Sequence, residues 1–313
     1  MVNNLDLIVY GSLNMDYVGY VKKLPSLGET VASSNFSIGP GGKAANQAVA
    51  AAKLTAKTAM VGRVGDDQIG QLMKSKLQES GVDDDNVWIT PNYQTGIAMV
   101  SVNPQGENTI VTHIGANDSL SKNDIDKSEN KLKQAQGAIL QLEMEKQVAE
   151  YIIEKVSRLE KKVILNLAPI VEIENEILKL VDLLIVNETE ASYLSDMEVS
   201  SVETAETAAG VISKLGINNV VITLGSSGAV FKDQYLTKHY SAPTVNVVDS
   251  TAAGDCFVAA VSTFWLKFGD LDLSVRNAVK VAALAVTKKG AQTSLPTLQE
   301  YKDFDEELKQ ISF

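Results

Sequence analysis

Cysteine and histidine are scarce in this chain of 313 residues, which contains one cysteine and two histidines. A single cysteine cannot form an intrachain disulfide, and it excludes a cysteine-rich metal site. The N-terminal stretch has no basic region before its first apolar run, so no secretory signal peptide is expected. No apolar run approaches the ~20 residues that span a bilayer. These absences predict a cytoplasmic protein with no membrane partner.

Basic residues are also in deficit, since 28 lysines and arginines face 39 aspartates and glutamates, for a net charge of −11. An acidic chain repels nucleic acid and anionic lipid, so neither is expected as a partner. The net charge leaves room for local positive sites that bind phosphate. The length is sufficient for one large domain or two modest ones, and either would bury a real core.

Short runs of Val, Ile and Leu alternate with helical patterns along most of the chain. Strands are expected at residues 5–10, 58–62, 137–142, 163–166, 183–186, 220–223 and 244–248. Helices are expected at about 67–80, at 256–268 and at 297–310. This alternation predicts an α/β fold, with a doubly wound and mostly parallel sheet that carries helices on both faces.

Two segments interrupt this rhythm with the alternation of apolar and polar residues that is typical of antiparallel strands. The first comprises residues 17–21 and 29–38, and the second comprises 96–102 and 109–111. They predict a small antiparallel β lid inserted in two pieces, at about 14–41 and 96–112, into a main domain of residues 1–13, 42–95 and 113–313. Nothing else in the chain is evidently available to cover its apolar face. We therefore expect the lid to cover a site, to pair with a second copy, or both.

The most informative segment is residues 249–255, DSTAAGD, between a predicted strand and a predicted helix. Its small residues leave backbone N–H groups unobstructed at a helix N-terminus, which favours bound anions. The carboxylate of Asp255 would repel a phosphate. The presence of this carboxylate in the turn is explained if Asp255 accepts a proton from a hydroxyl that attacks the phosphate. The alternative is that Asp249 and Asp255 are ordinary helix N-cap residues.

A second glycine-rich segment, residues 39–47 (GPGGKAANQ), opens another predicted helix. Adjacent glycines permit close approach of the backbone to a ligand. Lys43 lies in the first turn, where a cation is unfavourable unless an anion is nearby, and Asn46 follows on the same face. The two segments together suggest a site where a polyol meets a polyphosphate. The alternative is a glycine turn before an alanine-rich core helix.

Two further patterns point to a nucleotide and its metal. Asn187 and Glu190 lie three residues apart at the start of a predicted helix, so they share a face and could hold the water shell of Mg²⁺. The alternative is that the pair caps its helix. A glycine loop after a strand, with Thr223, Gly225, Ser226 and Gly228, suits the phosphates and ribose of a nucleotide. Any tight turn between a strand and the next element has a similar sequence.

Taken in order along nearly the whole chain, these segments resemble the signature segments of the ribokinase (PfkB-type) family of carbohydrate kinases. Further matches are residues 11–16 (GSLNMD), 28–30 (GET), 187–190 (NETE), 223–228 (TLGSSG) and 289–292 (KGAQ). The resemblance implies ATP-dependent phosphorylation of D-ribose at O5. The alternatives are a sibling kinase for 2-deoxyribose, fructose or a nucleoside, or a non-catalytic sugar sensor. A dinucleotide-dependent oxidoreductase is set aside because residues 11–14 lack the G-x-G-x-x-G pattern.

The resemblance also implies roles for individual residues. Asp255 would be the general base, Lys43 would reach the phosphates, and the backbone around Ala252, Ala253 and Gly254 would form an anion hole. The sugar would contact Asn14, Asp16, Gly41, Gly42, Lys43, Asn46, Ala98, Ile110, Glu143 and Asp255. Without the resemblance, Asp16 would be taken for a turn carboxylate and Glu143 for a solvated helix start.

The remaining implied sets hold the nucleotide and the cations. ATP would contact Asn187, Thr223, Gly225, Ser226, Gly228, Ala253, Gly254 and Val279, with Mg²⁺ held through water by Asn187 and Glu190. A monovalent cation, K⁺, would bind Asp249, Thr251, Ala285, Lys288, Gly290 and Ser294, although Lys288 could be part of a plain basic helix end. Relatives pair their lids, so a homodimer is expected. Ala44 and Ala252 replace glycines that are usual in the family, but both are small.

Overall fold

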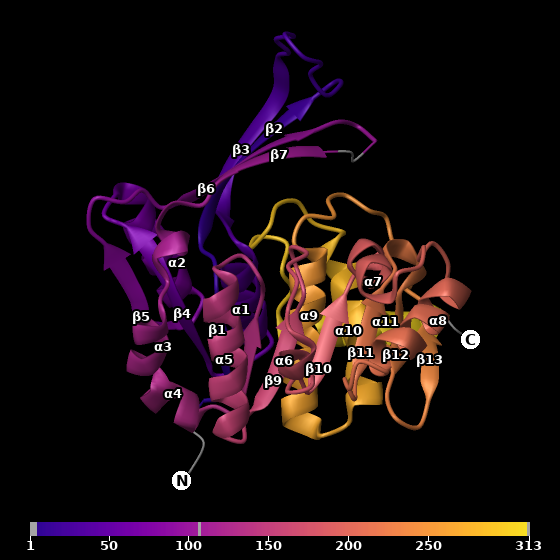
Figure 1. The fold of residues 1–313 in the computed structure, drawn as a ribbon. Coiled ribbons are helices and arrows are strands. Elements are labelled where there is room, and N and C mark those ends of the chain that lie inside the picture. The colour runs from indigo at the N-terminus through magenta and orange to yellow at the C-terminus, as the bar shows by residue number, and fades with distance from the viewer. Residues whose placement is uncertain (1–4, 106–107, 312–313) are drawn as a thin grey trace.

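A computed structural model describes residues 5–105 and 108–311. Residues 1–4 of the N-terminal stretch, residues 106–107 of the expected lid and residues 312–313 lie outside the described residues. The main body is a nine-stranded sheet of order β13-β12-β11-β10-β9-β8-β1-β4-β5 (Figure 1). The strands are β1 (Leu7–Tyr10), β4 (Thr58–Gly65), β5 (Asp83–Thr90), β8 (Gly137–Leu140), β9 (Lys162–Asn166), β10 (Leu183–Val186), β11 (Val220–Thr223), β12 (Ala229–Lys232) and β13 (Thr237–Tyr240). All pairs are parallel except the last two at the β13 edge, so the predicted mostly parallel sheet is confirmed.

Helices cover both faces of this sheet, as predicted. Side chains alternate across each strand, so Leu7 and Val9 enter one core while Ile8 and Tyr10 enter the other. The first core is closed by α1 (Lys43–Lys53), α2 (Gln68–Glu79), α9 (Ala253–Phe268), α10 (Leu271–Ala285) and α11 (Leu298–Ile311). The second is closed by α3 (Lys122–Lys127), α4 (Glu129–Gln134), α5 (Lys146–Arg158), α6 (Asn175–Leu178), α7 (Glu188–Ser195) and α8 (Val202–Ser213). Within the described part of the chain, every helix is too short or too polar to cross a bilayer.

The strand predicted at residues 244–248 is wrong, because this segment is a loop. The sheet already ends at β13, and the Val248 N–H donates to the carbonyl of Val286 at 2.8 Å instead of to a strand. Val247 and Val248 are 62% and 44% exposed, respectively. The helix that follows begins at Ala253, three residues earlier than expected. The apolar run is instead a loop in which Thr244, Val245 and Val247 line a cavity.

A separate sheet of order β3-β2-β6-β7 stands away from the body at the carboxyl end of the parallel strands (Figure 1). It contains β2 (Asn14–Val21), β3 (Ser33–Gly41), β6 (Gly96–Val102) and β7 (Asn108–His113). The prediction of an antiparallel sheet is wrong for its central pair, since β2 and β6 run parallel. The reason is topological: β2 follows β1 and β6 follows β5, and both of those strands leave the main sheet in the same direction.

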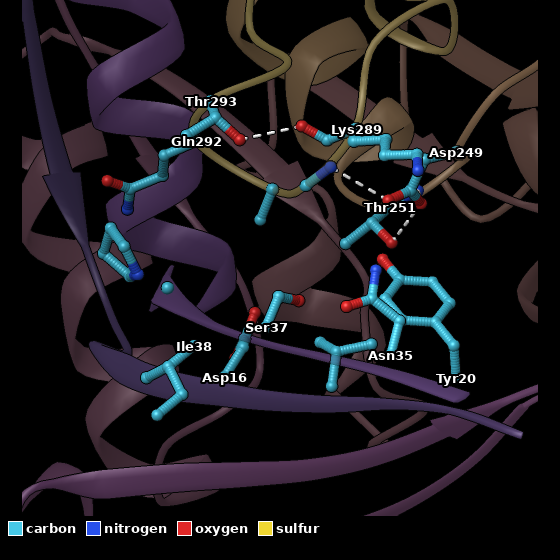
Figure 2. Close-up of a pocket in the computed structure, with 15 residues that line it drawn as sticks. Asp16, Tyr20, Asn35, Ser37, Ile38, Asp249, Thr251, Lys289, Gln292 and Thr293 are labelled. Carbon is cyan, nitrogen blue, oxygen red and sulfur yellow. Dashed lines mark hydrogen bonds between the residues drawn. The ribbon is translucent and has the colours of Figure 1, made fainter. Parts of the chain in front are cut away.

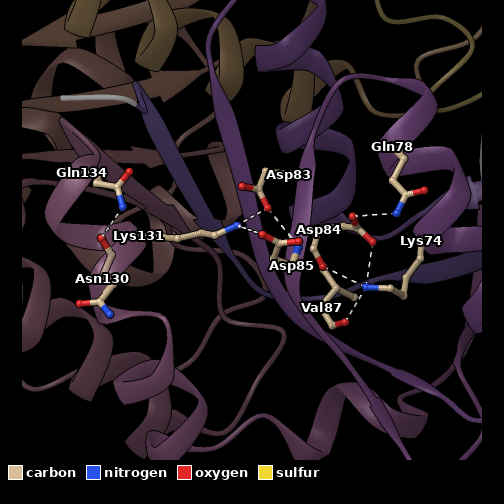
Figure 3. Close-up of polar contacts among 9 residues, drawn as sticks. All are labelled: Lys74, Gln78, Asp83, Asp84, Asp85, Val87, Asn130, Lys131 and Gln134. Carbon is tan, nitrogen blue, oxygen red and sulfur yellow. Dashed lines mark hydrogen bonds and ion pairs between the residues drawn. The ribbon is translucent and has the colours of Figure 1, made fainter. Parts of the chain in front are cut away.

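Strand β5 was not expected from the sequence, because it opens with three consecutive aspartates. Alternate side chains of a strand point to opposite faces, so the acidic triplet can reach helices on both sides. Asp83 and Asp85 both form ion pairs with the Lys131 ammonium from α4 (Figure 3), with Asp85 at 2.9 Å. Helix contacts on either face therefore hold this acidic edge strand in place.

The middle aspartate of the triplet, Asp84, is 7% exposed and faces α2. Its Oδ2 lies 2.8 Å from the Lys74 ammonium, and its Oδ1 accepts a hydrogen bond from Gln78 at 3.0 Å (Figure 3). The same ammonium donates to the carbonyls of Asp84 at 2.9 Å and Val87 at 2.7 Å. Lys74 therefore satisfies one buried charge and two backbone acceptors at once.

Replacing Lys74 with Met is expected to lower the free energy of unfolding by about 2 kcal/mol, because it leaves the buried Asp84 carboxylate without its cation. The matched control is Lys76→Met on the same helix. The Lys76 ammonium pairs with Glu79, and these two side chains are 41% and 57% exposed, respectively. That change should cost less than about 0.5 kcal/mol. Urea unfolding measures the free energy of unfolding of both variants. Equal losses in the two would contradict the role of Lys74 in holding the buried Asp84 carboxylate.

Candidate active site

The two glycine motifs meet at the carboxyl end of the main sheet, where α1 and α9 both begin. Gly42 is the N-cap of α1 with φ 86°, and an added Cβ would lie 2.7 Å from the Asn14 nitrogen and 2.8 Å from the Ser12 carbonyl oxygen. A Cβ on Gly41 would clash with the carboxylate of Asp16. The predicted close backbone approach is therefore made to β2 and the turn before it. It holds Asn14 and Asp16 beside the start of α1.

Asp255 lies in the first turn of α9 and faces α1. Its Oδ2 accepts a hydrogen bond from Asn46 Nδ2 at 2.9 Å, and its Oδ1 accepts one from Gln47 Nε2 at 3.0 Å. The N-cap position of α9 is held by Ala252, so the alternative that Asp255 is an N-cap is wrong. No role was predicted for Gln47, although its position one helical turn after Lys43 was a signal that it faces the same site.

Carboxylates gather around a single lysine at this site. Lys43 Nζ lies 3.8 Å from Glu143 Oε1, and the Ser12 hydroxyl donates to the other oxygen of Glu143. Glu143 lies in the loop after β8, so it does not start a helix. Burial acts against the charged form of Lys43, yet the carboxylates of Asp255, Glu143, Glu190 and Asp16 together raise its pKa. The lysine is therefore held charged at the centre of the site.

Burial raises the pKa of two carboxyl groups here. The pKa of Asp255 rises because the group is surrounded by protein, although Lys43 and the two amide donors act in the opposite direction. The pKa of Asp16 rises to about 7, mainly through burial and further through the charges of Asp255 and Glu143. Asp16 lies within β2 and is not a turn residue. Among the described residues none donates a hydrogen bond to its carboxylate, which leaves it available to a ligand.

Asn14 is held in a fixed orientation by Asn117 from the 3-10 helix η1 (Gly115–Ser119), which was not predicted from the sequence. Asn117 Nδ2 donates to Asn14 Oδ1 at 2.8 Å, and Asn117 Oδ1 accepts from the Leu13 N–H at 2.9 Å. The amide oxygen of Asn14 is thereby occupied, so its NH₂ group is the end that a ligand can reach. Nothing in the local sequence around Asn117 signals this role.

At the start of α9 only some of the backbone N–H groups are free to bind an anion. Ala252 has φ 60°, a left-handed conformation that costs an alanine about 1 kcal/mol and explains why glycine suits this position. The Ala253 N–H donates to the carbonyl of Ser250 at 3.2 Å, so that predicted donor is already engaged. In the described part of the chain, no acceptor meets the N–H groups of Gly254 and Asp255, and Gly254 faces open space. These two donors are free, and the Ala252 N–H likewise meets no acceptor among the described residues.

A largely apolar cavity of about 500 Å³ adjoins the start of α9. Valines 245 and 247 from the loop before α9 contribute to its wall, together with Phe257. The predicted nucleotide residues that line it are Thr223, Gly225, Ser226, Gly228, Ala253, Gly254 and Val279. Asn187 is the one member of that predicted set that does not line it. The cavity thus joins an apolar compartment to the free N–H groups of the helix.

A second cavity, of about 260 Å³, lies between the four-stranded sheet and the loops at 249–251 and 289–293 (Figure 2). Asp16 lines it from β2. In the strand register Asp16 pairs with Ala98 and Val100 pairs with Ile110, so Ala98 and Ile110 share the face of the sheet that carries Asp16. Ala98 is buried and Ile110 is 54% exposed.

Three of the predicted cation residues, Asp249, Thr251 and Gly290, are brought together beside this cavity. Asp249 Oδ1 accepts from the Thr251 N–H at 2.9 Å and from its hydroxyl at 2.6 Å, and Asp249 Oδ2 accepts from the Gly290 N–H at 2.9 Å (Figure 2). Ser294 is fully buried, and its hydroxyl donates to the carbonyl of Ala291 at 2.8 Å. The loop is therefore rich in oxygen atoms at fixed positions.

Two further members of that set lie at the end of α10. The Lys288 N–H donates to the carbonyl of Ala285 at 3.1 Å, and the Lys288 ammonium pairs with Glu300 of α11. The side chain of Lys288 is therefore engaged by α11.

Asn187 and Glu190 form a capping box at the start of α7, which was the alternative to a role in metal binding. The Glu190 N–H donates to Asn187 Oδ1 at 2.9 Å, and the Asn187 N–H donates to Glu190 Oε2 at 2.8 Å. Glu190 is 6% exposed, and burial raises its pKa while Lys43 acts against that rise. The pair thus caps its helix, and the charge of Lys43 acts on the Glu190 carboxyl group.

Known proteins share this sequence and fold along nearly the whole chain. Residues 4–298 match the pfkB family carbohydrate kinase. A ribokinase of Haemophilus influenzae is 38% identical, with 95% of this chain and 97% of that protein covered. A deoxyribokinase of Salmonella typhi is 35% identical over 96% of this chain and 98% of its own length. A solved ribokinase of Arabidopsis thaliana, complexed with ribose and ATP, has a TM-score of 0.86 at 32% identity, with 97% and 99% of the two chains covered.

The match spans both glycine motifs, both sheets and the helices that position Asp255 and Lys43. By sequence and by structure, the chain belongs to the PfkB family of carbohydrate kinases.

Proposed function

We propose that the protein transfers the γ-phosphoryl group of ATP to the O5 hydroxyl of D-ribose, giving D-ribose 5-phosphate and ADP. The observation that carries the proposal is the position of Asp255, at the start of α9 and next to the 500 Å³ cavity, with α1 donating to both of its oxygens. The similarity to proteins named ribokinase supports ribose as the sugar. A cytoplasmic location fits the single, buried Cys256.

Phosphoryl transfer depends mainly on in-line positioning and on stabilisation of the charge on the phosphoryl oxygens. Asp255 would accept the O5 proton as that oxygen attacks. The free N–H groups of Gly254 and Asp255, together with the Lys43 ammonium, would stabilise the transferred group. Because burial raises the pKa of Asp255, it is a stronger base than an ordinary aspartate. The rate should fall as the pH falls through that raised pKa.

The sugar would lie between α1 and the four-stranded sheet. Its hydroxyl groups both donate and accept hydrogen bonds, and the site offers both kinds of partner. The Asp16 and Glu143 carboxylates accept, while the Asn14 amide, oriented by Asn117, donates. Gly41, Gly42 and Asn46 lie at the same helix start, and Ala98 and Ile110 would cover the ring from the sheet. Binding of the sugar would thus draw the two sheets together.

ATP would place its base in the 500 Å³ cavity and its phosphates at the start of α9, which fits the apolar wall and the free N–H groups described above. Val279 would contact the base, and Thr223, Gly225, Ser226 and Gly228 the ribose and phosphates. No group of three or more His, Cys, Asp or Glu side chains suited to a metal occurs among the described residues. Mg²⁺ would therefore be held by the phosphates and by water, with Asn187 and Glu190 in contact with that water, and would neutralise phosphate charge.

A second candidate is phosphorylation of 2-deoxyribose, because a deoxyribokinase is 35% identical to this chain. The test is ADP formation by the purified protein with Mg-ATP and KCl, across D-ribose, 2-deoxyribose, D-fructose and adenosine. We expect D-ribose to give the highest kcat/KM. A preference for 2-deoxyribose would keep the mechanism and change the substrate. No activity on any of the four would contradict the proposed function.

In the same assay, Asp255→Asn should lower kcat by about 10²–10⁴-fold, because the attacking hydroxyl loses its proton acceptor. Ribose binding, measured by calorimetry, should persist, since the amide oxygen of the new side chain still accepts from Gln47, and Asn46 can turn its unpartnered Oδ1 toward the new NH₂ group. The control is Asp270→Asn, which changes the aspartate that caps the adjacent helix α10 and should leave kcat unaltered. Near-normal turnover of the Asp255 variant would remove this residue as the base.

Replacing KCl with NaCl at equal ionic strength should lower kcat. The oxygen-rich loop of Asp249, Thr251, Gly290 and Ser294, with the backbone carbonyls of Ala285 and Lys288, fits a large monovalent cation, which would order the start of α9. Asp249→Asn should remove the difference between the two salts. A rate that is indifferent to the cation in the unmodified protein would contradict this assignment.

The protein should sediment as a dimer. The face of the four-stranded sheet opposite Asp16 exposes Phe36, Met99 and Val111 by 54%, 51% and 63%, and apolar side chains gathered on one exposed sheet face favour pairing with a second copy. Met99→Glu should shift the sedimentation coefficient toward the monomer. The control Ile170→Glu, at a residue 39% exposed on a loop of the main body, should not. A fully active monomer of the unmodified protein would contradict the prediction.

A further inference from the structure

Gln47 is a fully buried amide that contacts the proposed base directly. Its Nε2 donates to Asp255 Oδ1 at 3.0 Å and to Asn166 Oδ1 at 3.1 Å, so both of its N–H bonds are used. Its Oε1 accepts from Gln141 Nε2, which makes three described partners for one side chain. A residue that only filled the core between α1 and the sheet would not need this polarity.

The backbone decides which way the Gln47 amide is turned. Asn166 Nδ2 donates to the carbonyl of Ile185 on β10 at 3.3 Å, and a carbonyl can only accept. The Asn166 oxygen is thereby directed to Gln47 and requires an N–H there. The same Gln47 nitrogen faces Asp255, so its amide oxygen cannot turn toward the carboxylate. A fixed carbonyl in the sheet thus determines, through two side chains, that a donor meets the base.

Gln141 adds a second constraint from the other side of Gln47. It is fully buried just after β8, and its nitrogen donates to the Gln47 oxygen. Within the described residues nothing donates to its own Oε1, and a buried acceptor without a partner is unfavourable. A leucine at this position would avoid that cost. What the glutamine provides in exchange is the donor that keeps the oxygen of Gln47 away from Asp255.

We propose that Gln47 is a positioning residue for phosphoryl transfer, and that the amide chain Ile185–Asn166–Gln47, with Gln141, fixes the plane of the Asp255 carboxylate and keeps it ionised. The inference rests on the proposed function, because it concerns the base of that reaction. With Asn46 holding the other oxygen, the carboxylate cannot rotate. Its remaining lone pairs would accept the proton of the attacking hydroxyl.

The charged groups around Asp255 explain why neutral donors are used. Lys43 from α1 is the one cation among its described electrostatic neighbours, whereas Glu143 from the loop after β8 adds repulsion and Asp16 from β2 is a further carboxylate. Burial also disfavours the ionised form. A second cation would compete with Lys43 for the phosphate. Two amide groups stabilise the carboxylate by hydrogen bonds and add no net charge.

The test is the pH dependence of kcat for Gln47→Met, which keeps the length of the side chain and removes the donor. Loss of one hydrogen bond to the ionised carboxylate should move the acid limb of the profile upward by about one pH unit. At neutral pH kcat should fall about tenfold or more, while KM for D-ribose and for ATP changes less than about twofold. A purely structural role would lower the amount of active protein without moving the acid limb.

The control is Gln136→Met, because Gln136 donates to the carboxylate of Asp6 at 2.9 Å at the amino end of the parallel strands, opposite to the site. The same chemical change there should leave the acid limb in place. If Gln47→Met does not fold, Asn166→Leu removes the acceptor that orients Gln47 but leaves the base and its donors. That variant should shift the limb in the same direction by a smaller amount.

An acid limb that stays in place in the folded variant would overturn the inference. If the unmodified protein phosphorylates no sugar, the proposed function itself is overturned. The two failures are therefore distinguished by the activity of the unmodified protein.

Discussion

The packing of α1 against the start of α9 is the contact on which the rest of the site depends. Residues 44–51 of α1 are all buried, and six of the eight are alanine or valine, so the helix can lie close to its neighbours. This closeness allows Asn46 and Gln47 to reach both oxygens of Asp255. A bulkier helix would hold these amides at a distance and leave a desolvated carboxylate without donors, which is a costly arrangement.

The same contact reconciles two opposed requirements. An anion is favoured at the start of α9 by its free N–H groups, and the proposed base, Asp255, stands at the same place. The carboxylate is turned toward α1 and is bound there, whereas the N–H groups of Gly254 and Asp255 remain free. Lys43, in the first turn of α1, supplies the positive charge between them. In the proposed function the helix starts are thus specialised, one for the phosphate and the other for the amides and the ammonium around the proposed base.

The parallel strands at the centre of the main sheet could be predicted because strands buried on both faces are continuous runs of Val, Ile and Leu. The edge strands could not: β5 begins with three aspartates whose charges are satisfied by Lys74 and Lys131, residues that only tertiary packing brings near. At residues 244–248, by contrast, a strand was predicted where the structure has a loop. That apolar run has the composition of a strand, but it lies beyond the last strand of the sheet and faces a cavity.

The sequence by itself determined the chemical groups of the site and the type of fold, because glycine-rich segments at helix starts and alternating strand and helix patterns are local properties. It indicated Asp255, Lys43 and Asn46, and it indicated two helix starts that follow glycine-rich segments. Only the tertiary structure decided which oxygen of Asp255 meets which amide, since Gln47 and Asp255 are 208 residues apart in the chain. It also decided that Asn166 and Gln141 turn the Gln47 nitrogen toward Asp255. The physical reason is that the direction of a buried hydrogen bond depends on how helices and strands pack together, and a sequence pattern does not contain that geometry.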